Sequence, residues 1–321
     1  MTEMQGEVFD LGYQHYNGPR EGRSRARKAI WKNGVRIILG MGKNFKAKIL
    51  PVLLFIAVII PALVLSFVAS ASGGFGGDQL GPAGYYQIVS IIILLFSAIM
   101  APELLCPDRR DGVITLYLVR PLTATDYIAG RWLAFFSITL ILVYSGQVVL
   151  FVGYTLAAAE PWTYLKDNWL DIPRFLAAGF ILSLFTTTLP MAVSAFTNRR
   201  AIAAAIVIGL FIILTFVPAS LSEDQCETTI VTVEDSDGNV RSGTRSENCG
   251  PLIGDAAKWV ALLDISQVPS HVNRMIFNQE PTELANKLVE ELPAIVPIAW
   301  YILLVVGPGF VLWWRYQRIR L

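Results

Sequence analysis

Six long stretches of the chain are nearly devoid of aspartate, glutamate, lysine and arginine, and they constrain the fold more than any other feature. They run approximately over residues 49–71, 85–105, 132–159, 175–197, 201–219 and 292–314, with Glu103 as the one charged exception. A helix that crosses the hydrocarbon core of a bilayer needs about 20 largely apolar residues. The sequence therefore predicts an all-α membrane protein with six transmembrane helices.

The composition agrees with this prediction. Hydrophobic residues make up 54% of the chain and charged residues 16%, whereas soluble domains carry roughly a quarter charged residues. The third stretch is longer than a perpendicular crossing requires, so we expect that helix to tilt or to project from the membrane. The first 48 residues are polar and basic, and no cleavable signal peptide is expected there.

The charges are segregated by side of the membrane. In a six-span arrangement, 19 of the 26 lysines and arginines fall on the side that holds both termini, and 17 of the 25 acidic residues fall on the other side. Loops retained in the cytoplasm are enriched in lysine and arginine. The sequence therefore predicts a multi-pass protein of the plasma membrane with both the N and C termini in the cytoplasm. The predicted parts of the chain are an N-terminal tail with a basic helix (1–48), the first five spans with the loop 106–131 (49–219), an outer loop (220–291), and the last span with a basic tail (292–321).

The long outer segment, residues 220–291, contains two of the three cysteines. Between Cys226 and Cys249 lie two β-prone runs around Asp237 and Gly238, a pattern typical of a hairpin. With Asp237 and Gly238 as a two-residue loop, cross-strand partners have numbers that sum to 475, so the two cysteines face each other. Disulfides persist in oxidising compartments, and we expect a disulfide-tied, extracytoplasmic β-hairpin. Two unpaired thiols in a loop are the alternative, and Cys106 is expected to be a free thiol.

Helical patterns also occur in this outer segment. One short helix is expected over Asp255–Leu263, and another is expected to begin near Pro281 and Thr282 and to continue toward the last span. Both have enough apolar residues to lie on or dip into the outer leaflet.

Residues 20–48 combine large apolar residues with many basic ones. When they are plotted at 100° per residue, the apolar residues share one side and most charges take the other. This pattern predicts an interfacial amphipathic helix before the first span, with a basic tail as the alternative. The apolar residues of this predicted helix are Ile30, Trp31, Val35, Ile38 and Leu39.

The cytoplasmic loop 106–131 has a mixed-charge turn, a short amphipathic stretch and a helix start near Thr125 and Asp126. Its run Asp-Arg-Arg-Asp-Gly at 108–112, then Leu-Tyr-Leu, Arg-Pro-Leu, Asp-Tyr and Gly-Arg, resembles the loop of type 2 (ABC-2) ATP-binding-cassette transporter permeases of bacteria. The six-span layout and the preceding basic helix are similar to that family over nearly the whole chain.

The resemblance implies a permease subunit of an ABC-type exporter that couples ATP hydrolysis by a separate ATPase to movement of an amphiphilic substrate, such as a lipid, drug or peptide. It implies a homodimer or a heterodimer with a related permease, bound to two copies of a cytoplasmic ATP-binding subunit that holds ATP and Mg²⁺. The loop is then a coupling helix that docks on the ATPase. Residues assigned to this contact are Glu103, Asp108, Arg109, Arg110, Asp111, Gly112, Leu116, Tyr117 and Arg120.

The chain itself is not expected to be an enzyme. It has no phosphate-binding loop of the Gly-x-x-x-x-Gly-Lys-Ser/Thr type, and its two histidines, His15 and His271, fall on opposite sides of the predicted membrane. No cofactor, metal or nucleic-acid partner is expected for this chain. Two other functions remain open: an ion-coupled transporter, and a membrane receptor or assembly factor that uses the 226–249 hairpin.

Overall fold

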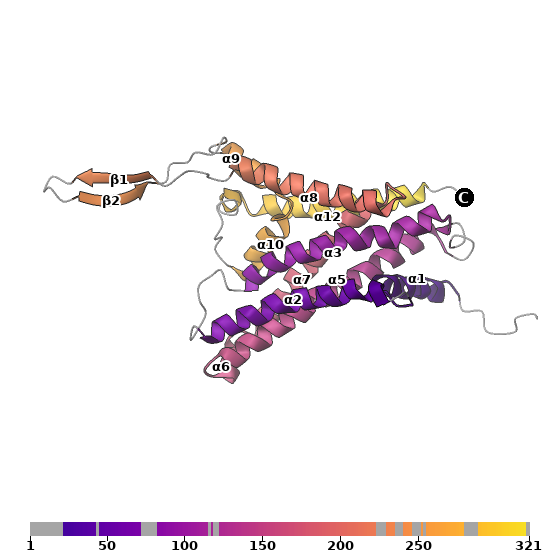
Figure 1. Cartoon of the computed structure of the whole chain (residues 1–321), viewed down its shortest axis with the longest axis horizontal. Helices are drawn as coiled ribbons and strands as arrows, with labels where there is room; N and C mark the ends of the chain where they lie inside the picture. The colour runs from indigo at the N-terminus through magenta and orange to yellow at the C-terminus, as the bar shows by residue number, and fades with distance from the viewer. Residues whose placement is uncertain are drawn as a thin grey trace, which may run out of the picture.

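A computed structural model describes residues 22–42, 45–71, 82–114, 117, 122–222, 229–234, 240–245, 252, 255–278 and 288–318. The helices of this part are α1 (Arg23–Ile38), α2 (Phe45–Ala71), α3 (Pro82–Arg110), α5 (Ala124–Ala157), α6 (Pro161–Asp167), α7 (Asp171–Ser194), α8 (Arg200–Ser222), α9 (Asp255–Ala261), α10 (Val268–Phe277) and α12 (Ile295–Gln317). Two strands, β1 (Thr229–Glu234) and β2 (Val240–Arg245), form a hairpin (Figure 1).

Six helices in the described residues are long and apolar enough to cross a membrane, which confirms the predicted number of spans. They are α2, α3, α5, α7, α8 and α12, and they form one elongated bundle (Figure 1). Over the most apolar 18-residue segment of each helix, 61% of the residues of α3 and 67% of those of α7 are buried, against 17% in α12. The two central helices therefore pack mainly against protein, and the outer helices present apolar faces to the surrounding lipid.

The loop between the second and third spans is shorter than its charges predicted. Helix α3 continues to Arg110, and α5 begins at Ala124, eight residues before the predicted start of the third span. Thr123 is the N-cap of α5, and Asp126 completes a capping box with it, so the predicted helix start at Thr125 and Asp126 was two residues late. With 34 residues, α5 is long enough to tilt or project, as expected.

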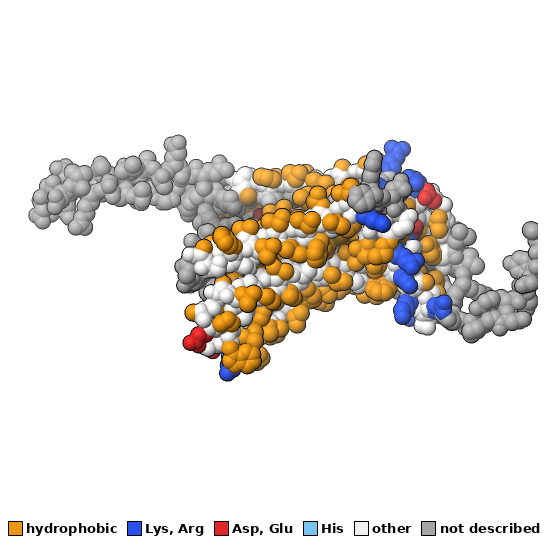
Figure 2. Space-filling view, turned by 60° about the horizontal axis from the view of Figure 1, so that its bottom comes forward, with side chains coloured by type: hydrophobic (Ala, Val, Ile, Leu, Met, Phe, Trp, Pro, Cys, Tyr) orange, Lys and Arg blue, Asp and Glu red, His pale blue; other side chains and the backbone are white. Residues whose placement is uncertain are grey.

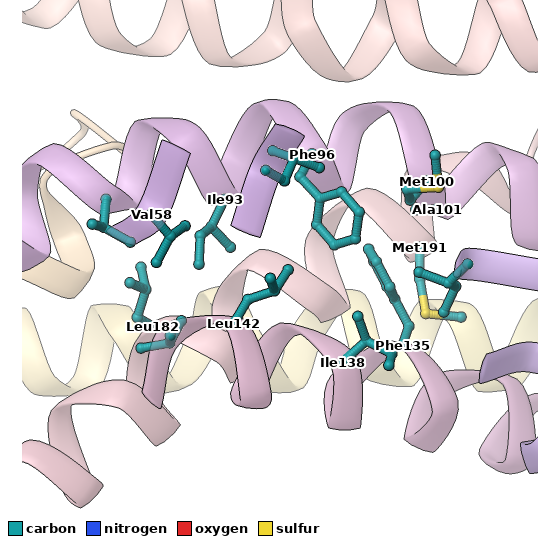
Figure 3. Packing of buried hydrophobic residues seen from close by; sticks show 14 of the residues in the cluster. Val58, Ile93, Phe96, Met100, Ala101, Phe135, Ile138, Leu142, Leu182 and Met191 are labelled. Carbon is teal, nitrogen blue, oxygen red and sulfur yellow. The ribbon is translucent and has the colours of Figure 1, made fainter. Parts of the chain in front are cut away.

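The main core lies between α2, α3, α5 and α7. Apolar side chains from these four helices interdigitate along most of the bundle length (Figure 3). Rings of α3 and α5 meet here, with the centroids of Phe96 and Phe135 5.7 Å apart. Tyr85 and Tyr86 place their hydroxyls on backbone carbonyls of α2 and α7, Val58 and Phe175, at 3.1 and 2.8 Å. These hydrogen bonds satisfy polar groups that would otherwise be buried without partners.

Helix α1 forms where the amphipathic helix was expected, and its apolar face packs on α5. Ile30 and Ile38 are 3% and 1% exposed, whereas Trp31 lies at the edge and donates to Ser137 Oγ at 3.3 Å. Two glycines permit the close crossing: a Cβ added at Gly34 would lie 2.6 Å from Ala134 Cβ, and one at Gly130 would lie 2.8 Å from Ile30 Cγ2. The predicted apolar stripe therefore holds α1 against the bundle, and its placement at the membrane interface stays a prediction.

Gly34→Ala is expected to destabilise the protein by about 1–3 kcal/mol, because the new methyl group overlaps Ala134 and α1 must move away from α5. Gly209→Ala is the matched control: it lies in α8 with no atom within 4 Å of the added Cβ, so it leaves stability unchanged or slightly raised. The midpoint of thermal unfolding in detergent measures both. Equal midpoints for the two variants would contradict this account of the α1–α5 crossing.

The hairpin register differs from the sequence prediction by one residue. Thr229 pairs with Arg245 and Glu234 with Val240, so partner numbers sum to 474 and the connection spans residues 235–239. The expected two-residue Asp237-Gly238 loop, with its sum of 475, was therefore wrong. Cys226 and Cys249 lie outside the described residues, and their disulfide stays a prediction.

The outer segment folds back into the bundle through a helix that the sequence did not predict. Helix α9 matches the expected Asp255–Leu263 helix, but α10 packs against α3, α7 and α12, and residues 279–287, which include Pro281 and Thr282, lie outside the described part. Burial of His271 on α10 lowers its pKa to about 4, so it is neutral at physiological pH. Among the described residues its Nε2 has no hydrogen-bond partner.

Candidate functional site

The end of the bundle where α3 finishes and α5 begins carries a buried ion pair. Asp108 lies on the last turn of α3, and its Oδ2 accepts hydrogen bonds from Arg131 Nη2 and, at 2.6 Å, from Tyr127 Oη, both on α5. The Arg131 side chain is 0% exposed and that of Asp108 14%. A guanidinium at such depth requires a paired carboxylate, because an unpaired buried charge is costly. Asp108 therefore fastens α3 to α5.

Aromatic rings complete the surroundings of this ion pair. The Arg131 Cζ atom lies 5.5 Å from the ring centroid of Tyr127 and 5.8 Å from that of Tyr117, within the range of cation–π attraction. Tyr127 in turn stacks on Tyr316 of α12, with centroids 5.8 Å apart. The cluster of Asp108, Arg131, Tyr117, Tyr127 and Tyr316 thus joins three spans and the loop between α3 and α5. We refer to it as the arginine cluster.

A second carboxylate ties α1 to the start of α5. Asp126 accepts from Arg23 Nε and Arg27 Nε, each at 2.7 Å, while it also accepts from the backbone N–H of Thr123 at 3.0 Å. Its side chain is 7% exposed. Because Asp126 is both a capping residue and the partner of two arginines, the beginning of α5 and α1 are held as one unit.

The end of α3 also contacts the turn between α7 and α8. Glu103 pairs with Arg200 at the start of α8, and Arg109 donates to the carbonyl oxygen of Ala195. The buried thiol of Cys106 lies 3.4 Å from the carbonyl oxygen of Thr197. Two residues assigned to the ATPase contact, Glu103 and Arg109, therefore make contacts inside the bundle.

Among the described residues of this loop, those directly after α3 form an exposed, tight turn. Gly112 adopts a left-handed conformation with φ of 67°, which favours glycine. Arg110 and Asp111 are 59% and 50% exposed and pair at 2.8 Å, and this hydrogen bond from Arg110 lowers the pKa of Asp111. We call Arg110, Asp111 and Gly112 the exposed turn. Leu116 and Arg120 lie outside the described residues.

The predicted site residues that the structure describes thus separate into three groups. Asp108 and Tyr117 belong to the arginine cluster, Glu103 and Arg109 contact the α7–α8 turn, and Arg110, Asp111 and Gly112 form the exposed turn. Arg131 and Tyr316 were missed. The available signal was Arg131 itself, an arginine directly before the apolar stretch at 132, which entered the prediction as a cytoplasmic charge and as the end of the motif that resembles the permease loop.

Basic side chains gather at the same end of the molecule, around α1, whereas hydrophobic side chains cover most of its length (Figure 2). Within the described residues, no group of three or more His, Cys, Asp or Glu side chains could hold a metal ion. The arrangement is an exposed turn connected to a buried polar cluster.

The six spans indicate a multi-pass membrane protein. The chain belongs to the ABC-2 family of transporter proteins, whose family model matches residues 20–305. It is thus a membrane permease component of an ABC transporter, a component distinct from the ATPase, and members of this family generally work with a cytoplasmic ATP-binding subunit. No curated protein matches the chain.

Proposed function

We propose that the chain is the permease subunit of an ABC-type exporter, in which a separate ATPase drives movement of an amphiphilic substrate across the membrane. The observation that carries the proposal is the connection of the exposed turn to the arginine cluster. Asp108 lies two residues before Arg110 on the same helix, and it contacts α5 directly. A force on the turn therefore reaches α3 and α5 without an intervening flexible segment.

The charge distribution supports the orientation. The basic end holds α1, the exposed turn and the end of α12, and 19 of the 26 basic residues lie on its side of the predicted spans. Under the positive-inside rule this end is cytoplasmic, where an ATPase has access to ATP. Both termini then face the cytoplasm, and the hairpin and α10 lie on the outer side of a bacterial inner membrane.

The proposed mechanism uses two rigid connections. Closure of two ATPase subunits around ATP pushes the exposed turn, and the Asp108–Arg131 pair passes this displacement to α5. Asp126 makes α1 follow, because Arg23 and Arg27 hold it to the same helix end. In a dimer of two permeases the resulting tilt of the bundles opens a path toward the outer side.

An amphiphilic cargo fits the interior better than an ion. The charged residues of the described spans lie toward the helix ends, whereas an ion relay places ionisable groups at membrane depth. The polar groups at depth are hydroxyls and one amide, among them Thr188, which accepts a hydrogen bond from Trp132 Nε1 at 3.1 Å. The ion-coupled transporter is the second candidate, and the receptor rests on the hairpin alone.

The test is affinity purification of the tagged chain in mild detergent, followed by mass spectrometry and an ATPase assay of the eluate. The expected result is an ATP-binding protein recovered in near-equal amount, with ATPase activity. Recovery of a stable chain without such a protein, from cells that express its genomic neighbours, would move the assignment to the ion-coupled transporter or the receptor.

A further inference from the structure

A groove of about 490 Å³ opens on the lipid-facing side of the bundle, next to the turn that connects α1 and α2. Its walls come from that turn and from α2, α3 and α5. Nine of its ten lining residues are apolar, among them Met41, Val52, Phe55 and Ile141, and Lys48 is the one charged residue of the lining.

The two ends of the groove differ in polarity. Lys48 and Met41 lie at the basic end, whereas Phe55 lies seven residues farther along α2, roughly 10 Å deeper at the rise of an α-helix. Val52, Phe55 and Ile141 are 58%, 44% and 60% exposed, so the walls are not closed by protein. The groove therefore has a cationic mouth at the level of α1 and an open apolar floor toward the membrane centre.

The surface next to the mouth is also cationic. Arg25, Lys28, Lys32 and Arg36 follow one stripe of α1, on the side opposite to Ile30, Gly34 and Ile38, which face the bundle. The Arg36 carbonyl accepts from the Met41 N–H at 2.9 Å, so the stripe ends directly at the groove. Blue side chains of this end are visible in Figure 2.

We propose that this groove binds one acyl chain of an anionic phospholipid, with the lipid phosphate at Lys48. The apolar floor matches a hydrocarbon chain, and the lysine at the mouth matches a negative headgroup. Anionic lipids are attracted to basic segments at the membrane surface by about 1 kcal/mol per residue. The neighbouring stripe of α1 strengthens this attraction but does not line the groove. Binding at this site requires neither an ATPase nor transport.

The experiment uses the full-length protein purified in detergent. Dioleoylphosphatidylglycerol and dioleoylphosphatidylcholine are added separately, and binding is measured by native mass spectrometry together with the thermal unfolding midpoint. The expected result is binding of phosphatidylglycerol in preference to phosphatidylcholine, with a higher unfolding midpoint. Lys48→Gln lowers the affinity for phosphatidylglycerol roughly fivefold. Lys28→Gln removes the same charge from α1 outside the groove and retains most of the preference.

Two further variants test the apolar floor. Ile141→Trp places a larger side chain in the groove. Because Ile141 is exposed, the substitution does not disturb the core. We expect it to abolish the rise in the thermal unfolding midpoint that phosphatidylglycerol causes. Val148→Trp is its control, since Val148 is 62% exposed two turns farther along the same face of α5 and does not line the groove. If Ile141→Trp does not fold, Val52→Trp makes the same test from α2.

The outcomes separate the possible occupants. Equal binding of both lipids, or equal loss in Lys28→Gln and Lys48→Gln, would show ordinary lipid contact or a diffuse charge effect and overturn the proposal. Displacement of phosphatidylglycerol as the protein concentration rises would assign the groove to a second copy of the chain and also overturn it. Failure of the lipid test leaves the ATPase recovery unaffected, so the two proposals fail independently.

Discussion

Asp108→Ala is expected to destabilise the purified protein by about 3–5 kcal/mol, because it leaves the Arg131 guanidinium buried without a counter-charge. The same substitution removes the acceptor of the Tyr127 hydroxyl. For a chain of this size the thermal unfolding midpoint should fall by roughly 10 °C. The measurement is the unfolding midpoint in detergent, together with the fraction of the protein that remains monodisperse.

Two controls distinguish the buried pair from a general effect of charge. Asp111→Ala removes a carboxylate only three residues away, but that carboxylate is 50% exposed, and the unfolding midpoint should stay close to that of the wild type. The double variant Asp108→Ala/Arg131→Met removes both charges and should regain most of the lost stability, because a buried pair can be replaced by apolar residues at little cost. Equal destabilisation by Asp108→Ala and Asp111→Ala would refute the role assigned to the arginine cluster.

Replacing Arg110 and Asp111 together by alanine should remove at least about nine-tenths of the ATPase that copurifies with the chain, while the unfolding midpoint stays within about 2 °C of the wild type. The two side chains pair only with each other in the described residues, so their loss does not open the core. At a protein interface, by contrast, a few charged contacts account for much of the binding energy. The readout is the molar ratio of ATPase to permease in the eluate.

The matched control for this double variant is Asp255→Ala/Lys258→Ala. These residues also form an ion pair, at 3.0 Å, but they lie on α9 in the outer segment, where Lys258 also pairs with Glu291 at 2.9 Å. We expect this control to recover the ATPase at the wild-type ratio. A wild-type ratio in the Arg110/Asp111 variant would mean that the exposed turn is not the ATPase contact. Replacing residues 108–111 together would confuse the two roles, because Asp108 is structural and Asp111 is not.

The six spans could be predicted because an apolar stretch of about 20 residues has few alternatives in a chain this hydrophobic. The end of α3 could not be, because charge was taken to end a helix, whereas the start of α5 was predicted two residues late. Asp108 remains helical with Arg131 as its partner, and Asp126 is paired with Arg23 and Arg27, and these partners lie 23 to 103 residues away in sequence. Such pairing depends on tertiary packing, which no local pattern contains.

The hairpin and α10 show two other limits. The β-prone runs were identified correctly, but the register depends on the length of the connection, and five residues in place of two changes the pairing by one residue. Helix α10 was missed because Ser270, His271 and Asn273 interrupt its apolar pattern, yet all three are buried. In the sequence, the polar residues of a buried helix that packs back on the bundle cannot be distinguished from those of an exposed loop.

Helix α5 differs from the other spans in one respect that bears on motion. Each of the other five carries a proline inside the helix, which removes a backbone hydrogen bond and provides a point of bending. The sequence of α5 has none over its 34 residues. It therefore acts as a stiff lever of roughly 50 Å, and a tilt of about 5° at the arginine cluster moves its far end by about 4 Å. Small displacements on one side of the membrane are thereby converted into larger ones beside α6 on the other.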